Sequence, residues 1–98
     1  DRTELQWQAA QQALMLRTAQ RYFELAVAQE SLQVLQRQYE AVQQAAAEAQ
    51  DRFVLGAAPI TATHEARARQ GALRAQVLAA QVALDLRRRE LADSTGLP

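Results

Sequence analysis

The stretch from Arg52 to Thr63 most constrains the fold, because it is the only convincing break between two long helical patterns. Gly56 can close a helix in the left-handed conformation without steric cost. Pro59 lacks an amide hydrogen and disfavours the helical region for the residue before it, so the first helix cannot continue through it. Thr61 then offers a side-chain oxygen as the N-cap of a new helix. A connection of about five residues is normal for an antiparallel helix pair, so this stretch predicts a sharp hairpin.

Heptad patterns flank the break on both sides. Apolar side chains recur in alternating steps of three and four residues, which is the pattern of a left-handed coiled coil. The core stripe of the first helix consists of Leu25, Ala28, Leu32, Leu35, Tyr39, Val42, Ala46, Ala49 and Phe53. The core stripe of the second helix consists of Ala66, Gln70, Leu73, Val77, Ala80, Leu84, Arg87 and Leu91. Folding about the break predicts contacts between residues whose numbers sum to about 115.

Each helix also carries a second heptad line, called here the outer stripe. The outer stripe of the first helix is Val27, Ser31, Val34, Gln38, Ala41 and Ala45, and that of the second is Ala68, Ala72, Ala75, Ala79, Val82 and Leu86. A period of 3.5 residues places these lines roughly 100° and 150° around the helix from the core stripes. One explanation is a broad apolar face in a three- or four-helix bundle. The other is that each helix has neighbours on two sides.

These patterns predict an all-α fold: a long antiparallel coiled-coil hairpin over residues 1–98, packed into an oligomeric helical bundle. We expect helices over about residues 3–55 and 61–93 and a tip over about residues 56–60. At 1.5 Å per residue the first helix is about 80 Å long and the second about 50 Å, so about twenty residues overhang. The overhang is apolar in part, through Leu5, Trp7, Leu14, Met15 and Leu16. We expect another copy, or the rest of a larger protein of which this is a fragment, to cover it.

Composition argues against several classes of function. The chain has no cysteine, which excludes disulfides and thiolate metal sites, and a net charge of zero argues against a nucleic-acid partner. His64 is the one histidine and lacks a second ligand at metal spacing, so an exposed or capping-region role is favoured. The acidic residues do not converge as a pair, and no phosphate loop or nucleophile motif is present. We therefore predict no enzyme, no cofactor and no metal.

Two features of the second helix left alternatives open. Gly71 in mid-helix is consistent either with a close helix neighbour or with a tolerated surface glycine. The run Arg87-Arg88-Arg89 suits the negative end of the helix dipole and is interpreted as a solvated helix end rather than a nucleic-acid patch. Gly96 and Pro98 are stop signals for this helix.

The residues around the break resemble a known family. Arg52 to Thr61 resembles the periplasmic tip of TolC-like outer-membrane channels, whose pattern is roughly Arg-aromatic-x-x-Gly-small-x-x-x-Thr/Ser-Asp. The segment from Arg17 to Leu25 resembles the family's Ala-x-x-Tyr-Phe-x-Leu segment on the helix that descends to the tip. The segments from Glu65 to Arg69 and from Leu91 to Gly96 resemble the start and end of the returning helix. The acidic residue that usually follows the Thr is replaced by Ala62.

This resemblance implies a periplasmic portion of a bacterial outer-membrane protein. Members of the family assemble as trimers whose hairpins form a tube, a passive conduit for drug efflux or type I secretion. The tip docks a periplasmic adaptor (membrane fusion) protein and meets the inner-membrane pump only indirectly. The resemblance assigns the tip and adaptor contacts to Arg52, Leu55, Gly56, Ala57, Ala58 and Thr61. With Ala62 in place of the acid, ionic gating at that position is in doubt.

A second hypothesis needs no transport role. The hairpin could be a self-associating coiled-coil interaction module that dimerises into a four-helix bundle. Periodicity alone does not separate the two hypotheses. Both predict self-association, because open stripes and an apolar overhang otherwise face water.

Overall fold

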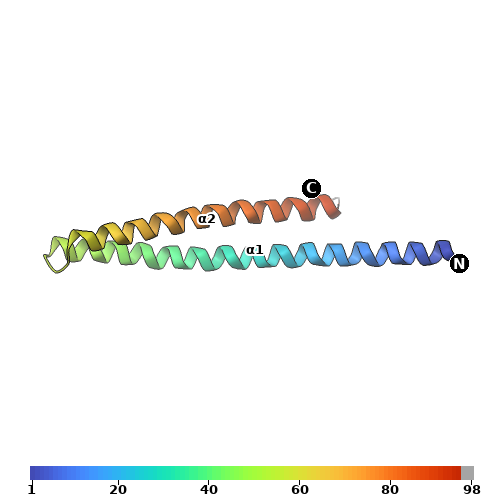
Figure 1. Ribbon diagram of the computed structural model, residues 1–98, viewed down its shortest axis with the longest axis horizontal. Coiled ribbons are helices and arrows are strands. Elements are labelled where there is room, and N and C mark those ends of the chain that lie inside the picture. The colour runs from blue at the N-terminus through green and yellow to red at the C-terminus, as the bar shows by residue number, and fades with distance from the viewer. Residues whose placement is uncertain (96–98) are drawn as a thin grey trace.

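The structure is a helical hairpin. A computed structural model describes residues 1–95, which form α1 (Arg2–Val54) and α2 (Ile60–Thr95) and contain no strand. The two helices lie side by side and antiparallel, and the molecule is 82 Å long (Figure 1). The predicted all-α hairpin is therefore confirmed. The predicted stop signals Gly96 and Pro98 lie outside the described residues.

Local capping explains where α1 begins and ends. Asp1 is its N-cap, and the side chain accepts a hydrogen bond of 3.3 Å from the amide of Thr3. At the other end the amide of Gly56 donates to the carbonyl oxygen of Phe53 (3.0 Å), and the amide of Ala57 donates to that of Arg52 (2.8 Å). This pair of bonds is a Schellman motif, which requires a left-handed residue, and Gly56 has φ 76°. The predicted role of the glycine is confirmed.

The predicted N-cap of the second helix was wrong. The helix begins at Ile60, so Thr61 lies inside its first turn. The amide of Ala62 donates to the carbonyl oxygen of Pro59 over 3.2 Å, which makes the proline the first acceptor of the helix. Proline suits this place because its φ is already close to helical and it has no amide hydrogen to leave unpaired.

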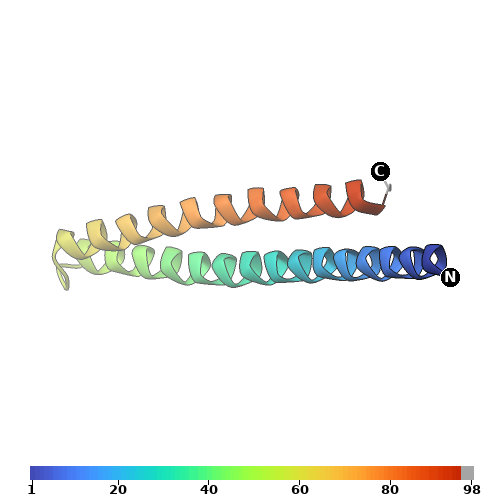
Figure 2. The same ribbon diagram turned by 45° about the vertical axis from the view of Figure 1, so that its right-hand side comes forward.

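The core is a narrow strip between the two helices. Its buried members are Leu32, Ala46, Thr63, Ala66 and Leu84. The other residues of both core stripes are half-buried, except for the exposed Phe53 at the tip. Near the turn the buried residues are small, whereas leucines are buried farther away, and in both views the ribbons lie closer near the turn than at the end of α2 (Figures 1 and 2). Small side chains allow two helix axes to approach closely, so residue size shapes this taper.

Contacts between the helices agree with the predicted register only in part. Tyr39 lines a shallow recess with Val77, as expected, but Gln70 donates a hydrogen bond to its hydroxyl over 3.4 Å. Glu24 contacts Arg87, four residues nearer the turn than a sum of about 115 predicts. Core stripes repeat every seven residues and supply no marker that distinguishes such neighbouring alignments. The discrepancy therefore arises from long-range packing.

The overhang is present as predicted. Residues 1–17 are all exposed, and Trp7 keeps 61% of its accessible surface. The helix continues past the end of α2 without a partner along this stretch (Figure 2). None of the described helices is long and apolar enough to cross a membrane.

Candidate interaction surfaces

The predicted tip residues gather at one end of the molecule. The turn spans residues 55–59 and connects the two helices at the end opposite both termini (Figure 1). Five of the six are exposed, namely Arg52, Leu55, Gly56, Ala57 and Thr61. Ala58 is half-buried against the hairpin. The tip is therefore an accessible surface whose backbone is fixed by the Schellman motif.

Phe53, Val54 and Ile60 were not among the predicted tip residues, and they enlarge this surface beside Leu55. Val54 and Leu55 are 71% and 82% exposed, and Phe53 and Ile60 are partly exposed beside them. The heptad pattern accounts for Phe53 alone, so the consecutive run of three apolar residues was a signal that could have identified this patch. An exposed apolar cluster on a rigid turn is suited to contact with another protein.

The two outer stripes face solvent over residues 27–45 of α1 and 68–86 of α2. All twelve of their residues are exposed. Val27 and Val82 keep 48% and 68% of their accessible surface. Neither stripe contributes to the core of a single hairpin, so a broad apolar face in a three- or four-helix bundle and neighbours on two sides both stay open as explanations. The stripes give the molecule two unpartnered apolar edges.

Gly71 lies in the same open environment. A Cβ atom added to it would meet nothing within 4 Å. Within one hairpin it is therefore a surface glycine, and no helix of the same chain approaches it closely.

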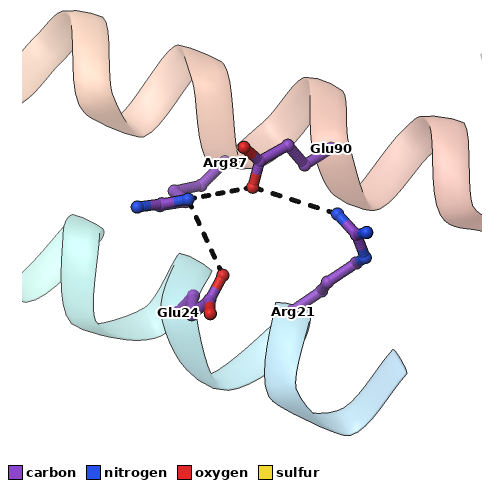
Figure 3. A network of polar contacts seen from close by, with 4 residues as sticks. All are labelled: Arg21, Glu24, Arg87 and Glu90. Atoms are coloured by element: carbon purple, nitrogen blue, oxygen red, sulfur yellow. Dashed lines mark hydrogen bonds and ion pairs between the residues drawn. The ribbon is translucent and has the colours of Figure 1, made fainter. Parts of the chain in front are cut away.

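A cross-helix ion network lies where α2 approaches its end. Arg87 Nη1 is 3.0 Å from Glu90 Oε2 and 3.7 Å from Glu24 Oε2, and Arg21 Nη1 is 3.9 Å from the same Glu90 oxygen (Figure 3). We call these four residues the clasp. Arg87 is half-buried between the helices, as its place on the core stripe predicts, so the interpretation of the arginine run as a solvated end fits only the exposed Arg88 and Arg89.

The charged and titratable residues outside the clasp include a pair within one helix and an exposed histidine. Arg88 pairs with Asp85 of its own helix at 3.7 Å. His64 is exposed in the first turns of α2, as expected. Among residues 1–95, no group of three or more His, Cys, Asp or Glu residues is placed to hold a metal ion.

Comparison with known proteins finds a relative for most of the chain. Over 75 residues, or 76% of its length, the chain is 39% identical to the outer membrane protein TolC of Vibrio cholerae. It spans 17% of the length of that relative. No family model matches the chain, and no solved structure matches it. The similarity agrees with the resemblance drawn from the tip and its flanking segments.

Proposed function

We propose that the chain is a structural segment of the periplasmic helical tunnel of a TolC-like outer-membrane channel, a passive conduit for efflux or secretion. The observation that supports this most directly is the 39% identity to the outer membrane protein TolC over 75 residues. A tunnel wall requires helices that pack with neighbours on both sides, and the two exposed outer stripes supply such edges. The segment needs no catalytic group for this role.

We further propose that the tip docks a periplasmic adaptor protein. Leu55 is 82% exposed at the apex, and the Schellman motif at Gly56 holds it in a fixed position. Preorganised exposed apolar side chains reduce the ordering cost of association. The exposed side chains of Phe53 and Val54 extend the same surface. The tip therefore offers an apolar contact that a second helical hairpin could cover.

A chimera tests the tunnel role. The 75 matching residues of this chain would replace their counterparts in the Vibrio cholerae protein, in a strain that lacks its own copy. We expect the chimera to assemble in the outer membrane and to restore drug export, measured as reduced intracellular accumulation. A chimera that reaches the membrane as an oligomer but leaves accumulation unchanged would contradict the proposal.

Variants in the chimera identify the surfaces involved. Val34→Glu and Ala75→Glu place charges on the two outer stripes and should abolish assembly. Gln33→Glu changes an exposed residue outside both stripes and should not. Leu55→Asp should leave assembly intact but abolish capture of the adaptor hairpin, with Gln33→Asp as the matched control.

The interaction-module hypothesis predicts a different outcome. The isolated chain would then self-associate and remain unaffected by Leu55→Asp, and it would show no affinity for any adaptor hairpin. Adaptor binding that depends on Leu55 favours the channel segment.

A further inference from the structure

We propose that the clasp fixes the register of the hairpin and fastens the end of α2 to α1. Its four charges alternate in sign across the helix interface, with Arg21 and Glu24 on α1 and Arg87 and Glu90 on α2 (Figure 3). Glu90 and Arg87 each contact both helices, so the contacts form a connected network rather than separate pairs. The inference concerns the hairpin itself and does not depend on the proposed channel.

The position of the clasp complements that of the turn. The turn fastens one end of α2, and the clasp lies beyond Leu84, which is 3% exposed. Beyond this point α2 continues only to Thr95, and the first residues of α1 extend past its end without a partner helix. The helix pair is therefore held at both ends, with the core strip between them.

The core stripes alone do not specify one register. A slip of seven residues returns every core-stripe position to the core stripe, because both helices repeat in heptads. Such a slip would separate the oppositely charged residues of the clasp. Moving Arg87 by seven residues along α1 would place it at Arg17 or at Ser31 instead of Glu24. Like charges repel at the first position, and the second offers no carboxylate.

The same slip also separates the other cross-helix pair. Glu90 would move from Arg21 to Leu14 or to Ala28, neither of which can pair with a carboxylate. The native alignment is thus the one among these heptad alternatives that places opposite charges together at both positions. Charged residues beside an apolar interface are a known determinant of helix pairing.

Partial exposure makes the clasp sensitive to salt. The four side chains keep between 31% and 49% of their accessible surface. The Debye length falls to about 3 Å at 1 M salt, which is comparable to the distances within the network. High salt should therefore loosen the end of α2 while the apolar strip near the turn stays closed.

Charge reversal with rescue tests the proposal. One double variant, Arg21→Glu with Glu24→Arg, exchanges the two charges of the clasp on α1. The other, Arg87→Glu with Glu90→Arg, exchanges the two charges on α2. Each double variant sets like charges against each other across the interface, whereas the quadruple variant restores both pairs with opposite polarity. Amide hydrogen exchange would be measured for residues 85–94 and for residues 62–80.

We expect each double variant to accelerate exchange over residues 85–94 about fivefold or more, because exposed ion pairs contribute up to about 1 kcal/mol each. Residues 62–80 should change little, and the quadruple variant should return to the wild-type rate. Arg87→Gln is a milder variant in case a double variant does not fold, and it should remove most of the salt dependence of exchange. Asp85→Arg with Arg88→Asp is the matched control, since that pair lies within α2.

Distances between spin labels at Gln33→Cys and Gln76→Cys would report the register. A slip of one heptad moves the labels by about 10 Å along the axis. Unchanged exchange in both double variants, or a quadruple variant no closer to wild type than they are, would overturn the proposal.

Discussion

Thr63 is a polar residue in the otherwise apolar core strip between the two helices. Its side chain is 4% exposed, and its hydroxyl oxygen Oγ1 has no hydrogen-bond partner. A buried hydroxyl that loses its contact with water without gaining a partner is destabilising. The other buried residues near the turn are Ala46 and Ala66, whose side chains offer no acceptor.

Replacing this hydroxyl should stabilise the hairpin. Thr63→Val keeps the shape and the branched Cβ and removes the unpaired group, so we expect the free energy of unfolding to rise by about 1 kcal/mol. Urea denaturation followed by circular dichroism measures the change. Thr61→Val is the control, because Thr61 is exposed and should respond much less. A loss of stability in the Thr63 variant would indicate that the hydroxyl has a partner.

The two described glycines should respond in opposite directions to alanine. Gly56 has φ 76°, a conformation that strains any residue with a Cβ atom, so Gly56→Ala should lower the free energy of unfolding by about 1 kcal/mol. Gly71 is helical and unobstructed, so Gly71→Ala should raise it by about 1 kcal/mol. Thermal unfolding of both variants provides the comparison. A destabilising Gly71→Ala would instead show that an assembled neighbour packs against this position.

At the scale of the helices, α1 and α2 contact each other along one strip only. Leu84 is the most completely buried leucine of α2, whereas Leu86 two residues later keeps 48% of its surface on the outer stripe. Two leucines in one turn of one helix therefore lie in different surroundings, one in the core strip and the other in solvent. Stability of the hairpin and assembly of hairpins can be separated by substitution.

Replacing each of these two leucines by alanine should lower the stability of the hairpin by different amounts. Leu84→Ala should destabilise the hairpin by about 2–4 kcal/mol, since it removes buried methyl groups and leaves a cavity. Leu86→Ala should change the stability of a single hairpin by less than about 0.5 kcal/mol. Both variants would be compared by urea denaturation at a low protein concentration. Equal costs would mean that Leu86 is buried in an assembly even there.

At the scale of the whole molecule, much apolar surface has no partner within the chain. It comprises the overhang with Trp7, the two outer stripes and the tip with Leu55. Proteins rarely leave such long apolar surfaces in water, so we expect concentration-dependent self-association. Sedimentation equilibrium would measure it. Val82→Glu on the outer stripe should shift the equilibrium toward monomer, and Gln76→Glu, exposed outside that stripe, should not. A strictly monomeric wild-type chain at high concentration would contradict the expectation.

The sequence by itself determined the helices, the break between them and the composition of the strip they bury. These features depend on local physics: a seven-residue repeat, a residue that accepts positive φ and a proline without an amide hydrogen. The place of Leu55, Gly56 and Ala57 in the turn followed from the same signals, whereas Arg52 and Thr61 were assigned to the tip by the resemblance and lie in the helices. Among these local features only the start of α2 was misplaced, since Thr61 and Pro59 were competing signals two residues apart.

Only the tertiary structure decided how the helices align. The register, the clasp and the taper depend on which residues far apart in sequence meet. Heptad repeats make alignments that differ by whole turns nearly equivalent in apolar packing, so the pattern within one helix does not choose among them. Arg87 shows the reason most clearly. The heptad pattern places it on the core stripe, but its ion pair with Glu24 depends on which residue of the other helix lies opposite.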